Sequence, residues 1–430
     1  MTNGINALSE CLGCRAALPA PFLDLGQTPL ANSYLPPDAA DEAEEKLPLA
    51  VAYCSYCHLV QLTRTVAPAR LFSRYAYFSS YSESFLAHAQ AMAASYVQRF
   101  ALGHDRRVLE LASNDGYLLQ FFSQRGISVL GVEPAANIAA AARARGIPTL
   151  ECFFDLATAP EVIATFGRAH LVVGNNVLAH APSVNAFLAG VAACLERDGA
   201  AAFEFPYLRD LLDRVEFDTI YHEHVFYYSL TAIDLLARRA GLELFDAVRT
   251  PVHGGSLRVF LQHPGTRPVG VAVVAILREE REVGLTDPEI FSSFGTRVER
   301  LRHDLRALLC RLKRAGKRIA AYGAPAKGNT LLNYCEIGSD LIEFTVDRSP
   351  HKQGKLLPGS RLPICEPQRL LAAMPDYTLI LPWNIADEIV EQQQAYVRAG
   401  GRFIVPVPHP HVLEPENLSL PQASTVRHDG

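Results

Sequence analysis

Two pairs of cysteines constrain the amino-terminal part of the chain more than any other feature. Cys11 and Cys14 form one CxxC pair, and Cys54 and Cys57 form a second pair after 39 intervening residues. Each pair can present two thiolates to one tetrahedral zinc ion at about 2.3 Å. A segment of this size has too little core to fold stably alone, so the metal would supply much of its stability. We therefore predict a structural zinc site of four cysteines in a domain at residues 1–70.

The segment between the two pairs contains an acidic, proline-flanked stretch at residues 36–48. We expect this stretch to be a surface excursion. The other five cysteines are scattered and lie mostly in apolar surroundings, which favours buried inert thiols. They are Cys152, Cys194, Cys310, Cys335 and Cys365.

Composition places the chain among folded, soluble proteins. Its 430 residues correspond to about three domains, and 49% hydrophobic residues exclude wholesale disorder. A formal net charge of −5 argues against a nucleic-acid partner, which requires a basic face. The longest apolar runs, such as residues 271–277, are too short to span a membrane. We expect a cytoplasmic protein, monomeric or weakly homo-oligomeric, with no nucleic-acid or membrane partner.

Predicted strands and helices alternate from Arg107 onward. Residues 108–111 form a short β-rich run, the loop 112–116 contains small residues, and an apolar helical stretch follows. A second predicted strand ends at Glu133 and Pro134. This alternation indicates a parallel sheet with right-handed crossovers, in which ligands bind at the carboxyl ends of the strands.

The chemistry of the first loop favours S-adenosylmethionine over a nicotinamide dinucleotide. A dinucleotide site needs GxGxxG for its pyrophosphate, whereas residues 112–116 read Ala-Ser-Asn-Asp-Gly. The aspartate would repel a pyrophosphate but suits the ammonium of a methionyl group. Glu133 could accept two ribose hydroxyls, and a later strand ends in two asparagines. The cofactor candidates are Glu110, Ala112, Asn114, Asp115, Glu133, Pro134, Asn175 and Asn176.

Four consecutive polar residues follow the fifth predicted strand of this region. Tyr221, His222, Glu223 and His224 can all exchange protons or bind an oxyanion, and they lie among aromatic residues. Packing alone explains such a cluster poorly, although an ordinary polar loop is the alternative. The sequence lacks HExxH, which disfavours a catalytic zinc site. Candidates for substrate contact elsewhere are His253, Ser256 and His180, the last of which could equally be structural.

The last third of the chain repeats the strand, loop and helix pattern. An amphipathic helix is predicted over residues 287–316. Strands are predicted at residues 318–322, 342–346, 377–381 and 402–406. The loop 323–328 has neither the Walker nor the dinucleotide order. We predict a second doubly wound domain at 266–410, with an anion site at the helix start after its first strand, and a tail at 411–430.

Six motifs occur along the chain in a fixed order. They are the two CxxC pairs, Tyr75-Ala-Tyr77-Phe-Ser-Ser, the loop 112–116, Tyr221-His-Glu-His224, His253-Gly-Gly-Ser256 and residues 322–330. Together they resemble the three-domain sugar C-methyltransferases, which act on nucleotide-linked 4-keto-deoxysugars in antibiotic and cell-surface polysaccharide pathways. The resemblance covers residues 11 to about 408. It implies an α/β fold with a small zinc-binding domain, a class I methyltransferase Rossmann-like domain at 71–265 and a second Rossmann-like domain.

One residue departs from the usual methyltransferase loop. Ala112 stands where these enzymes usually have glycine. Alanine is tolerable there if its φ angle is negative, because a positive φ strains a residue that carries a Cβ.

The resemblance implies methylation of a carbon next to a ketone. A sugar carbon becomes a carbanion only when a neighbouring carbonyl acidifies its hydrogen, and a 4-keto sugar meets that need. Imidazole, with an unperturbed pKa of about 6.5, suits a general base at neutral pH. Spacing alone does not rank His222 against His224, and the family pattern favours His224. Tyr221 would steady the oxyanion, and Glu223 would orient the sugar or its amino substituent.

The resemblance also implies ligand contacts outside this cluster. The second Rossmann-like domain would hold the nucleotide sugar, expected to be dTDP-linked and methylated at C-3. Tyr77 could reach the cofactor and Tyr75 the substrate, although a half-buried strand explains both equally well. Candidates near the phosphates are Lys327, Asn329 and Thr330, with Asn384 at a strand end, while Lys352 and Lys355 could be solvated surface charges.

Other functions remain open at this point. An O-methyltransferase would use the same cofactor domain without forming a carbanion. A zinc-bearing RNA methyltransferase or a non-catalytic S-adenosylmethionine-binding regulator would also carry both motifs. The acidic balance of the chain disfavours the RNA-binding alternative.

Overall fold

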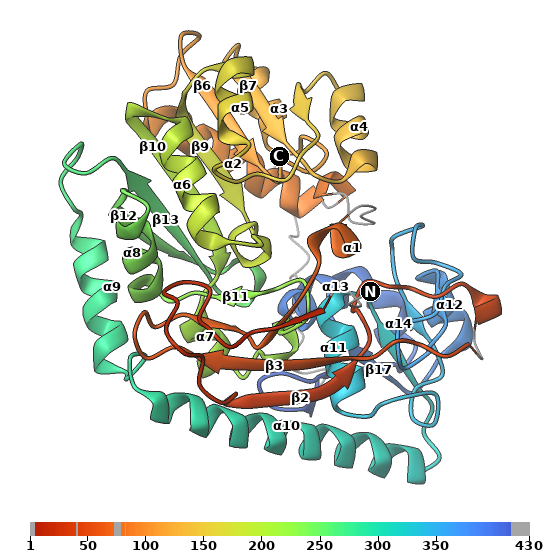
Figure 1. Cartoon of the computed structure of the whole chain (residues 1–430). Helices are drawn as coiled ribbons and strands as arrows, with labels where there is room; N and C mark the ends of the chain where they lie inside the picture. Colours follow the sequence, from red (N-terminus) through yellow and green to blue (C-terminus); the bar gives the residue numbers. More distant parts are fainter. Residues whose placement is uncertain (1–4, 40–41, 73–78, 82, 414–430) are drawn as a thin grey trace, which may run out of the picture. The chain divides into compact units, whose positions relative to one another are not determined.

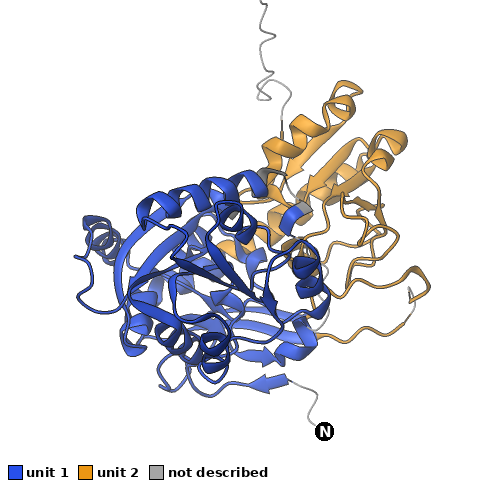
Figure 2. Ribbon diagram, turned by 90° about the horizontal axis from the view of Figure 1, so that it is seen from above, with its two compact units in different colours: residues 1–27, 47–296 blue, residues 28–46, 297–430 orange. Residues whose placement is uncertain are grey.

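The computed structural model describes residues 5–39, 42–72, 79–81 and 83–413 (Figure 1). The chain forms two compact units, and neither is one continuous stretch of sequence (Figure 2). The first unit contains residues 1–27 and 47–296, and the second contains residues 28–46 and 297–430. The cysteine pairs and the cofactor segment therefore share the first unit.

A four-stranded sheet adjoins the amino-terminal cysteines. Its strands are β2 (Leu23–Thr28), β3 (Leu47–Tyr53), β4 (Val60–Leu62) and β11 (Phe226–Tyr227), in the order β11-β4-β3-β2 (Figure 1). β11 lies far along the chain from its partner, and it pairs antiparallel with β4 through Phe226 opposite Gln61 and Tyr227 opposite Val60. Around it lie β1 (Ile5–Ala7), β5 (Arg64–Val66) and α1 (Pro68–Phe72). A strand from outside the predicted zinc domain thus completes this sheet.

A seven-stranded sheet forms the rest of the first unit. Its order is β12-β13-β10-β9-β6-β7-β8, and only β13 runs antiparallel to its neighbours. The chain order reverses between β6 and β9, where a ligand site is expected at the carboxyl ends. The strands are β6 (Arg107–Leu111), β7 (Ser128–Val132), β8 (Thr149–Leu150), β9 (Ala169–Asn175), β10 (Leu195–Pro206), β12 (Glu243–Thr250) and β13 (Ser256–Gln262). This topology confirms the predicted class I methyltransferase fold.

Helices cover both faces of the seven-stranded sheet (Figure 1). One apolar core contains residues of α2, α3 and α4, and the other contains residues of α5, α6, α8 and α9 together with three cysteines of the two CxxC pairs. The helices are α2 (Glu83–Arg99), α3 (Leu119–Ser123), α4 (Ala136–Ala144), α5 (Ala159–Phe166), α6 (Val184–Cys194), α7 (Leu208–Asp213), α8 (Leu230–Arg239) and α9 (Val271–Glu282). The cysteine sites therefore share a core with the methyltransferase fold.

Two side chains cap the start of α8. The Ser229 hydroxyl accepts a hydrogen bond from the Ala232 amide (3.1 Å), as expected for an N-cap serine. Glu280, from α9, is buried and accepts the amides of Leu230 (2.6 Å) and Thr231 (2.8 Å). A carboxylate near a helix amino terminus also complements the helix dipole. These contacts fix α8 against α9.

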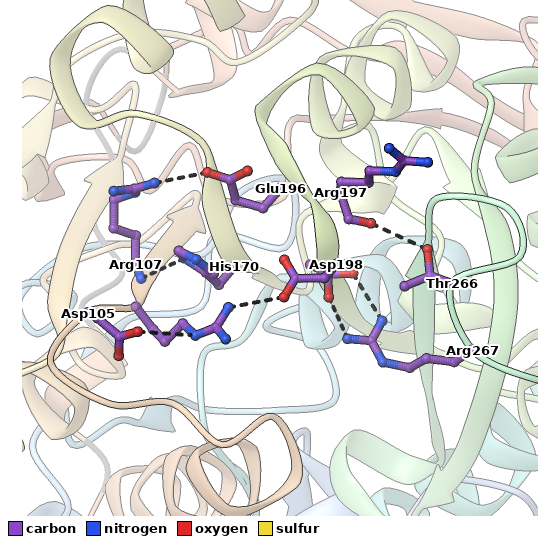
Figure 3. A network of polar contacts seen from close by, with 10 residues as sticks. Asp105, Arg107, His170, Glu196, Arg197, Asp198, Thr266 and Arg267 are labelled. Carbon is purple, nitrogen blue, oxygen red and sulfur yellow. Dashed lines mark hydrogen bonds and ion pairs between the residues drawn. The ribbon is translucent and has the colours of Figure 1, made fainter.

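A polar network occupies the amino-terminal edge of the same sheet (Figure 3). The Arg107 side chain pairs with Glu196 (2.9 Å), and its backbone amide donates to His170 Nδ1 (3.1 Å). Arg267 donates to the carbonyl of Asp198 (2.6 Å). These groups satisfy one another, so they connect the strand beginnings at the edge opposite the expected ligand site.

The second unit contains a six-stranded sheet with the order β16-β15-β14-β17-β18-β19. Its strands are β14 (Ile319–Tyr322), β15 (Thr345–Val346), β16 (Ile364–Cys365), β17 (Tyr377–Ile380), β18 (Arg402–Val405) and the antiparallel β19 (His411–Val412). Helices α11 (Ala326–Tyr334), α12 (Gln368–Ala373), α13 (Ala386–Gln392) and α14 (Gln394–Arg398) accompany it, after the long α10 (Pro288–Arg314). The strand order confirms the predicted second α/β domain.

Residues 36–46 of the predicted surface excursion belong to the second unit, whereas Leu47 and Pro48 begin β3 in the first unit. Leu35 and Leu356 form an antiparallel bridge, with amide-to-carbonyl distances of 3.0 and 2.8 Å. Glu44 accepts a hydrogen bond from the Gly359 amide (2.7 Å). Most of residues 36–46 that the structure describes are exposed, but these contacts show that the segment is an ordered part of this unit.

Across the ranges that the structure describes, none of the helices combines the length and the apolar composition needed to cross a membrane.

Candidate functional site

The four predicted metal ligands lie together. The sulfur atoms of Cys11, Cys14, Cys54 and Cys57 all lie within 4.8 Å of one another. The distance is 3.5 Å both from Cys11 to Cys57 and from Cys14 to Cys54. This separation is far longer than a disulfide and close to the roughly 3.8 Å that tetrahedral zinc–sulfur geometry implies. A hydrogen bond from Cys57 lowers the pKa of Cys11 to about 5, which favours a thiolate. The cluster therefore fits a structural zinc ion.

Both CxxC turns have the same backbone geometry. The residue after each pair, Arg15 or His58, adopts a left-handed conformation with φ of 68° or 57°. The amides of these residues donate to the carbonyls of Cys11 and Cys54, each at 2.8 Å. Two matching turns bring four sulfur atoms around one centre.

The first cysteine turn also contacts the methyltransferase fold. Asn185 in α6 donates its amide to the carbonyls of Leu12 (3.0 Å) and Gly13 (3.1 Å). Arg239 at the end of α8 donates to the Gly13 carbonyl (2.8 Å). A Cβ at Gly13 would lie 3.0 Å from Leu59, so this position accommodates little more than a hydrogen. The zinc site is therefore built into the first unit.

The loop after β6 is strained, because Ala112 does not have the negative φ at which alanine would be tolerated there. Ala112 has a φ of 53°, and Asn114 has a φ of 49°. Asparagine tolerates this region, whereas alanine adopts it at a cost of about 1 kcal/mol or more. The Glu133 carboxylate holds the turn by accepting the amides of Asn114 (3.0 Å) and Ala135 (2.9 Å). Pro134 lies half-buried between them.

Three acidic side chains lie close together beneath this loop. Asp115 is 0% exposed, and its Oδ2 accepts hydrogen bonds from Arg145 (2.9 Å) and the Ser80 hydroxyl (2.5 Å). Burial raises the pKa of Glu110 and of Glu133, and the charge of Asp115 raises both further. The loop is therefore an environment that favours a positively charged ligand.

Several buried oxygen atoms near the carboxyl ends of β6 and β9 lack a partner among the described residues, and they include one atom in each of three predicted cofactor contacts. These three atoms are Oδ1 of Asp115, Asn175 and Asn176. Asn175 donates its amide to the Tyr117 hydroxyl (3.0 Å), and Asn176 has a φ of 53°. Unpaired buried acceptors of this kind fit donors on a bound molecule. The ammonium and ribose hydroxyls of S-adenosylmethionine are such donors, so the residues fit this cofactor.

Tyr221 and His224 form a hydrogen-bonded pair. His224 Nδ1 lies 2.9 Å from the carbonyl of Thr219, which can only accept, so Nδ1 carries the proton. Nε2 is then the basic nitrogen, and the Tyr221 hydroxyl donates to it at 2.6 Å. The His180 ring contacts His224 edge-on at 4.8 Å. Burial lowers the pKa of His180 to about 4, so this ring is neutral.

The other two residues of the predicted catalytic cluster lie differently. His222 is 2% exposed, and its Nε2 lies 3.3 Å from the carbonyl of Pro48 in β3. Burial lowers the pKa of His222 to about 4. Glu223 is buried as well. The structure thus brings Tyr221 and His224 together and directs His222 to the neighbouring sheet.

Four other residues of the first unit are predicted to contact the substrate or the cofactor. Ser256 is buried, and its hydroxyl donates to the carbonyl of Val252 (2.9 Å) within the same turn. His253 lies in the short helix Val252–Gly254, and only its backbone is described. Tyr75 and Tyr77 lie outside the described residues. These four assignments stay predictions.

In the second unit, Lys327 and Asn384 come together. Lys327 lies in the first turn of α11 after β14, and Asn384 lies in the short helix Trp383–Ile385 after β17. The Lys327 ammonium donates to Asn384 Oδ1 and lies 4.2 Å from the centre of the Trp383 ring. The chain order reverses between β14 and β17, so these side chains occupy the edge where doubly wound sheets bind ligands.

Asn329 and Thr330 are buried in α11. Asn329 donates its amide to the carbonyl of Ala31 (2.5 Å), which precedes the excursion in the second unit. Lys352, interpreted as a surface charge, has a side chain that is only 15% exposed and donates to the Ala324 carbonyl (2.9 Å). Sequence reasoning also missed Trp383, although an aromatic residue beside an amide at a strand end was a usable signal.

Comparison with known proteins agrees with this geometry. Residues 11–72 match a family described as a zinc binding domain, residues 85–247 a methyltransferase domain and residues 251–408 a C-methyltransferase C-terminal domain. The C-methyltransferase NovU of Streptomyces niveus is 38% identical over 418 residues, which cover 97% of this chain and 100% of NovU. The chain belongs to the C-methyltransferase family. It is an S-adenosylmethionine-dependent C-methyltransferase with a cysteine zinc site.

Two solved structures similar to this C-methyltransferase each match less than half of its chain. Magnesium protoporphyrin IX methyltransferase from Synechocystis PCC 6803 is 15% identical, with a TM-score of 0.34, and covers 41% of this chain and 83% of its own. The PH0226 protein from Pyrococcus horikoshii is also 15% identical, with a TM-score of 0.35, and covers 45% of this chain and 97% of its own.

Replacing a buried zinc ligand should unfold more than the amino-terminal sheet, because the cysteines share a core with α6 and α8. We expect Cys57→Ser to lower the zinc content below one ion per chain and the stability by roughly 3 kcal/mol or more. Metal analysis and thermal melting measure both quantities. Cys152→Ser is the matched control, and a C57S protein with full zinc and parent stability would contradict the assignment.

Relieving the strain at Ala112 should stabilise the protein. Ala112→Gly removes the Cβ that disfavours a φ of 53°, for an expected gain of about 1 kcal/mol in the free energy of unfolding. Ala135→Gly, at a φ of −81°, should give no gain. Equal effects of both substitutions in denaturant unfolding would show that Ala112 is not strained.

Proposed function

We propose that the protein methylates C-3 of a dTDP-linked 4-keto-deoxysugar through an enolate. The observation that carries this proposal is the Tyr221–His224 pair, in which one imidazole nitrogen is fixed as the proton donor and the other is left basic. An O-methyltransferase needs only to deprotonate a hydroxyl, whereas C-methylation must remove a hydrogen from carbon. A positioned base with a hydroxyl beside it suits the harder task.

The pair is connected to the cofactor edge of the sheet. The short helix Leu178–His180 follows the two asparagines at the end of β9. The amide of Val225, next to His224, donates to the carbonyl of Ala179 (2.7 Å). These contacts support a reaction centre beside the carboxyl end of β9.

In the proposed reaction, His224 Nε2 removes a proton from the carbon next to the ketone. The electron pair of that C–H bond forms a carbon–carbon double bond, and the 4-oxygen becomes an enolate oxygen. The Tyr221 hydroxyl then donates to this oxygen instead of to Nε2. S-adenosylmethionine, when bound, supplies the electrophilic methyl group that the carbon acquires as the ketone re-forms. Glu223 would bind a sugar hydroxyl or amino group.

The second unit would bind the diphosphate of the nucleotide. Lys327 carries the positive charge, Asn384 fixes its ammonium, and Trp383 covers one side of it. The first turn of α11 adds backbone amides that favour an anion. This arrangement supports Lys327 and Asn384 over the buried Asn329 and Thr330 as phosphate contacts.

Proton removal can be tested without methyl transfer. The parent protein, given a dTDP-4-keto-6-deoxysugar in deuterated water without a methyl donor, should exchange the C-3 hydrogen faster than the buffer alone. His224→Ala should slow the catalysed exchange by about 100-fold or more. His170→Ala removes a histidine at the opposite sheet edge and should leave the rate unchanged. Exchange at the parent rate in H224A would eliminate His224 as the base. In a second reaction with S-adenosylmethionine added, a methyl group found on oxygen would eliminate C-methylation of this sugar.

Phosphate binding can be tested separately by calorimetry. Lys327→Ala should weaken binding of the sugar nucleotide by roughly 10-fold or more, because a charge-assisted hydrogen bond is lost. The affinity for S-adenosylmethionine should stay within about twofold. Lys317→Ala removes an ion pair with Asp376 (3.0 Å) in the same unit and serves as the control. A loss of cofactor affinity with unchanged nucleotide affinity would reverse the roles of the two units.

A further inference from the structure

We propose that His222 is a positioning residue that holds the Tyr221–His224 pair against the four-stranded sheet β11-β4-β3-β2, which we call the zinc-binding sheet. The inference rests on the proposed role of His224 as the base. It concerns how that base is kept in place.

The loop is held to the zinc-binding sheet directly after His224. The Val225 carbonyl accepts the amide of Leu62 (2.9 Å), and the next two residues pair with β4 as β11. Within β4, the buried Gln61 accepts the amide of Leu12 in the first cysteine turn (2.8 Å). A continuous set of hydrogen bonds therefore runs from the first cysteine turn to the carboxyl side of the pair.

His222, which lies between Tyr221 and His224 in the sequence, attaches this segment to the same sheet. Its Nε2 lies 3.3 Å from the carbonyl of Pro48 in β3, the strand that leads into the second cysteine turn. A carbonyl only accepts hydrogen bonds, so Nε2 carries the proton. The ring is 2% exposed, and burial lowers its pKa to about 4, so it stays neutral in the physiological range. A neutral imidazole that donates its N–H to a backbone carbonyl is suited to holding a loop in place.

The position of His222 in the turn is the reason why we expect its attachment to affect turnover. The His224 amide donates to the carbonyl of Tyr221 (2.9 Å), which places His222 at the centre of the turn that joins the two side chains. The turn places the Tyr221 hydroxyl 2.6 Å from Nε2 of His224. Displacement of reacting groups by about 1 Å can cost 100-fold in rate. Loss of the bond to Pro48 should therefore reduce turnover more than it reduces ligand binding.

Two amide substitutions separate positioning from simple destabilisation. Glutamine at position 222 can extend an N–H about as far as Nε2, whereas asparagine is one methylene shorter. We expect His222→Asn to lower kcat for the keto sugar by roughly 100-fold and His222→Gln by less than about 10-fold. KM for the sugar and Kd for S-adenosylmethionine should change by less than about threefold in both. His170→Ala, which loses an imidazole–backbone contact at the other sheet edge, should keep the parent kcat.

A second readout does not depend on the substrate. The ¹⁵N signals of the His224 ring, identified by their absence in H224A, report the hydrogen bonds of both nitrogens. They should shift in H222N, stay near the parent position in H222Q and remain unchanged in H170A. Equal kcat values and unshifted His224 signals in H222N and H222Q would overturn the inference. If the parent methylates no keto sugar, the proposed function fails, and the ring signals still decide whether His222 positions His224.

Discussion

The pairing of β11 with β4 is the contact on which the first unit depends. Two residues, Phe226 and Tyr227, complete a sheet whose other strands come from the amino-terminal segment. A four-stranded sheet with so few residues has little apolar area to bury, so the cysteine cluster and the core shared with α6 and α8 must stabilise it. The same pairing fixes the residues that follow His224. The zinc-binding sheet thus supports one side of the loop that carries His224.

Both units place their reactive side chains by the same rule. In each sheet the chain order reverses between two neighbouring parallel strands, and the candidate ligand residues lie at the carboxyl ends there. At this edge of the first unit, Ala112, Asn114 and Asn176 all have positive φ angles. Strain of this kind persists only where the surrounding structure imposes it, and it concentrates at functional sites. The opposite edge is filled by side chains that satisfy one another.

Local patterns were sufficient to predict the architecture. These patterns, two CxxC pairs, an acidic residue at the end of a strand and a glycine-bearing loop, each involve only a few neighbouring residues. The structure contains the corresponding cluster of four cysteines and both sheets. Contacts between distant segments were not predictable. Nothing in Phe226 and Tyr227 indicates pairing with β4, and no spacing rule separates the orientation of His222 from that of His224. The φ of Ala112 also escaped prediction, because the Glu133 hydrogen bond that holds its loop comes from the next strand.

Hydrogen exchange measured by mass spectrometry, before and after removal of zinc with a chelator, tests most directly whether the zinc-binding sheet supports the catalytic loop. We expect the amides of residues 221–228 to lose protection together with those of β4, while the central strands β6 and β9 keep theirs. Retained protection across residues 221–228, with β4 already exchanging freely, would contradict this dependence.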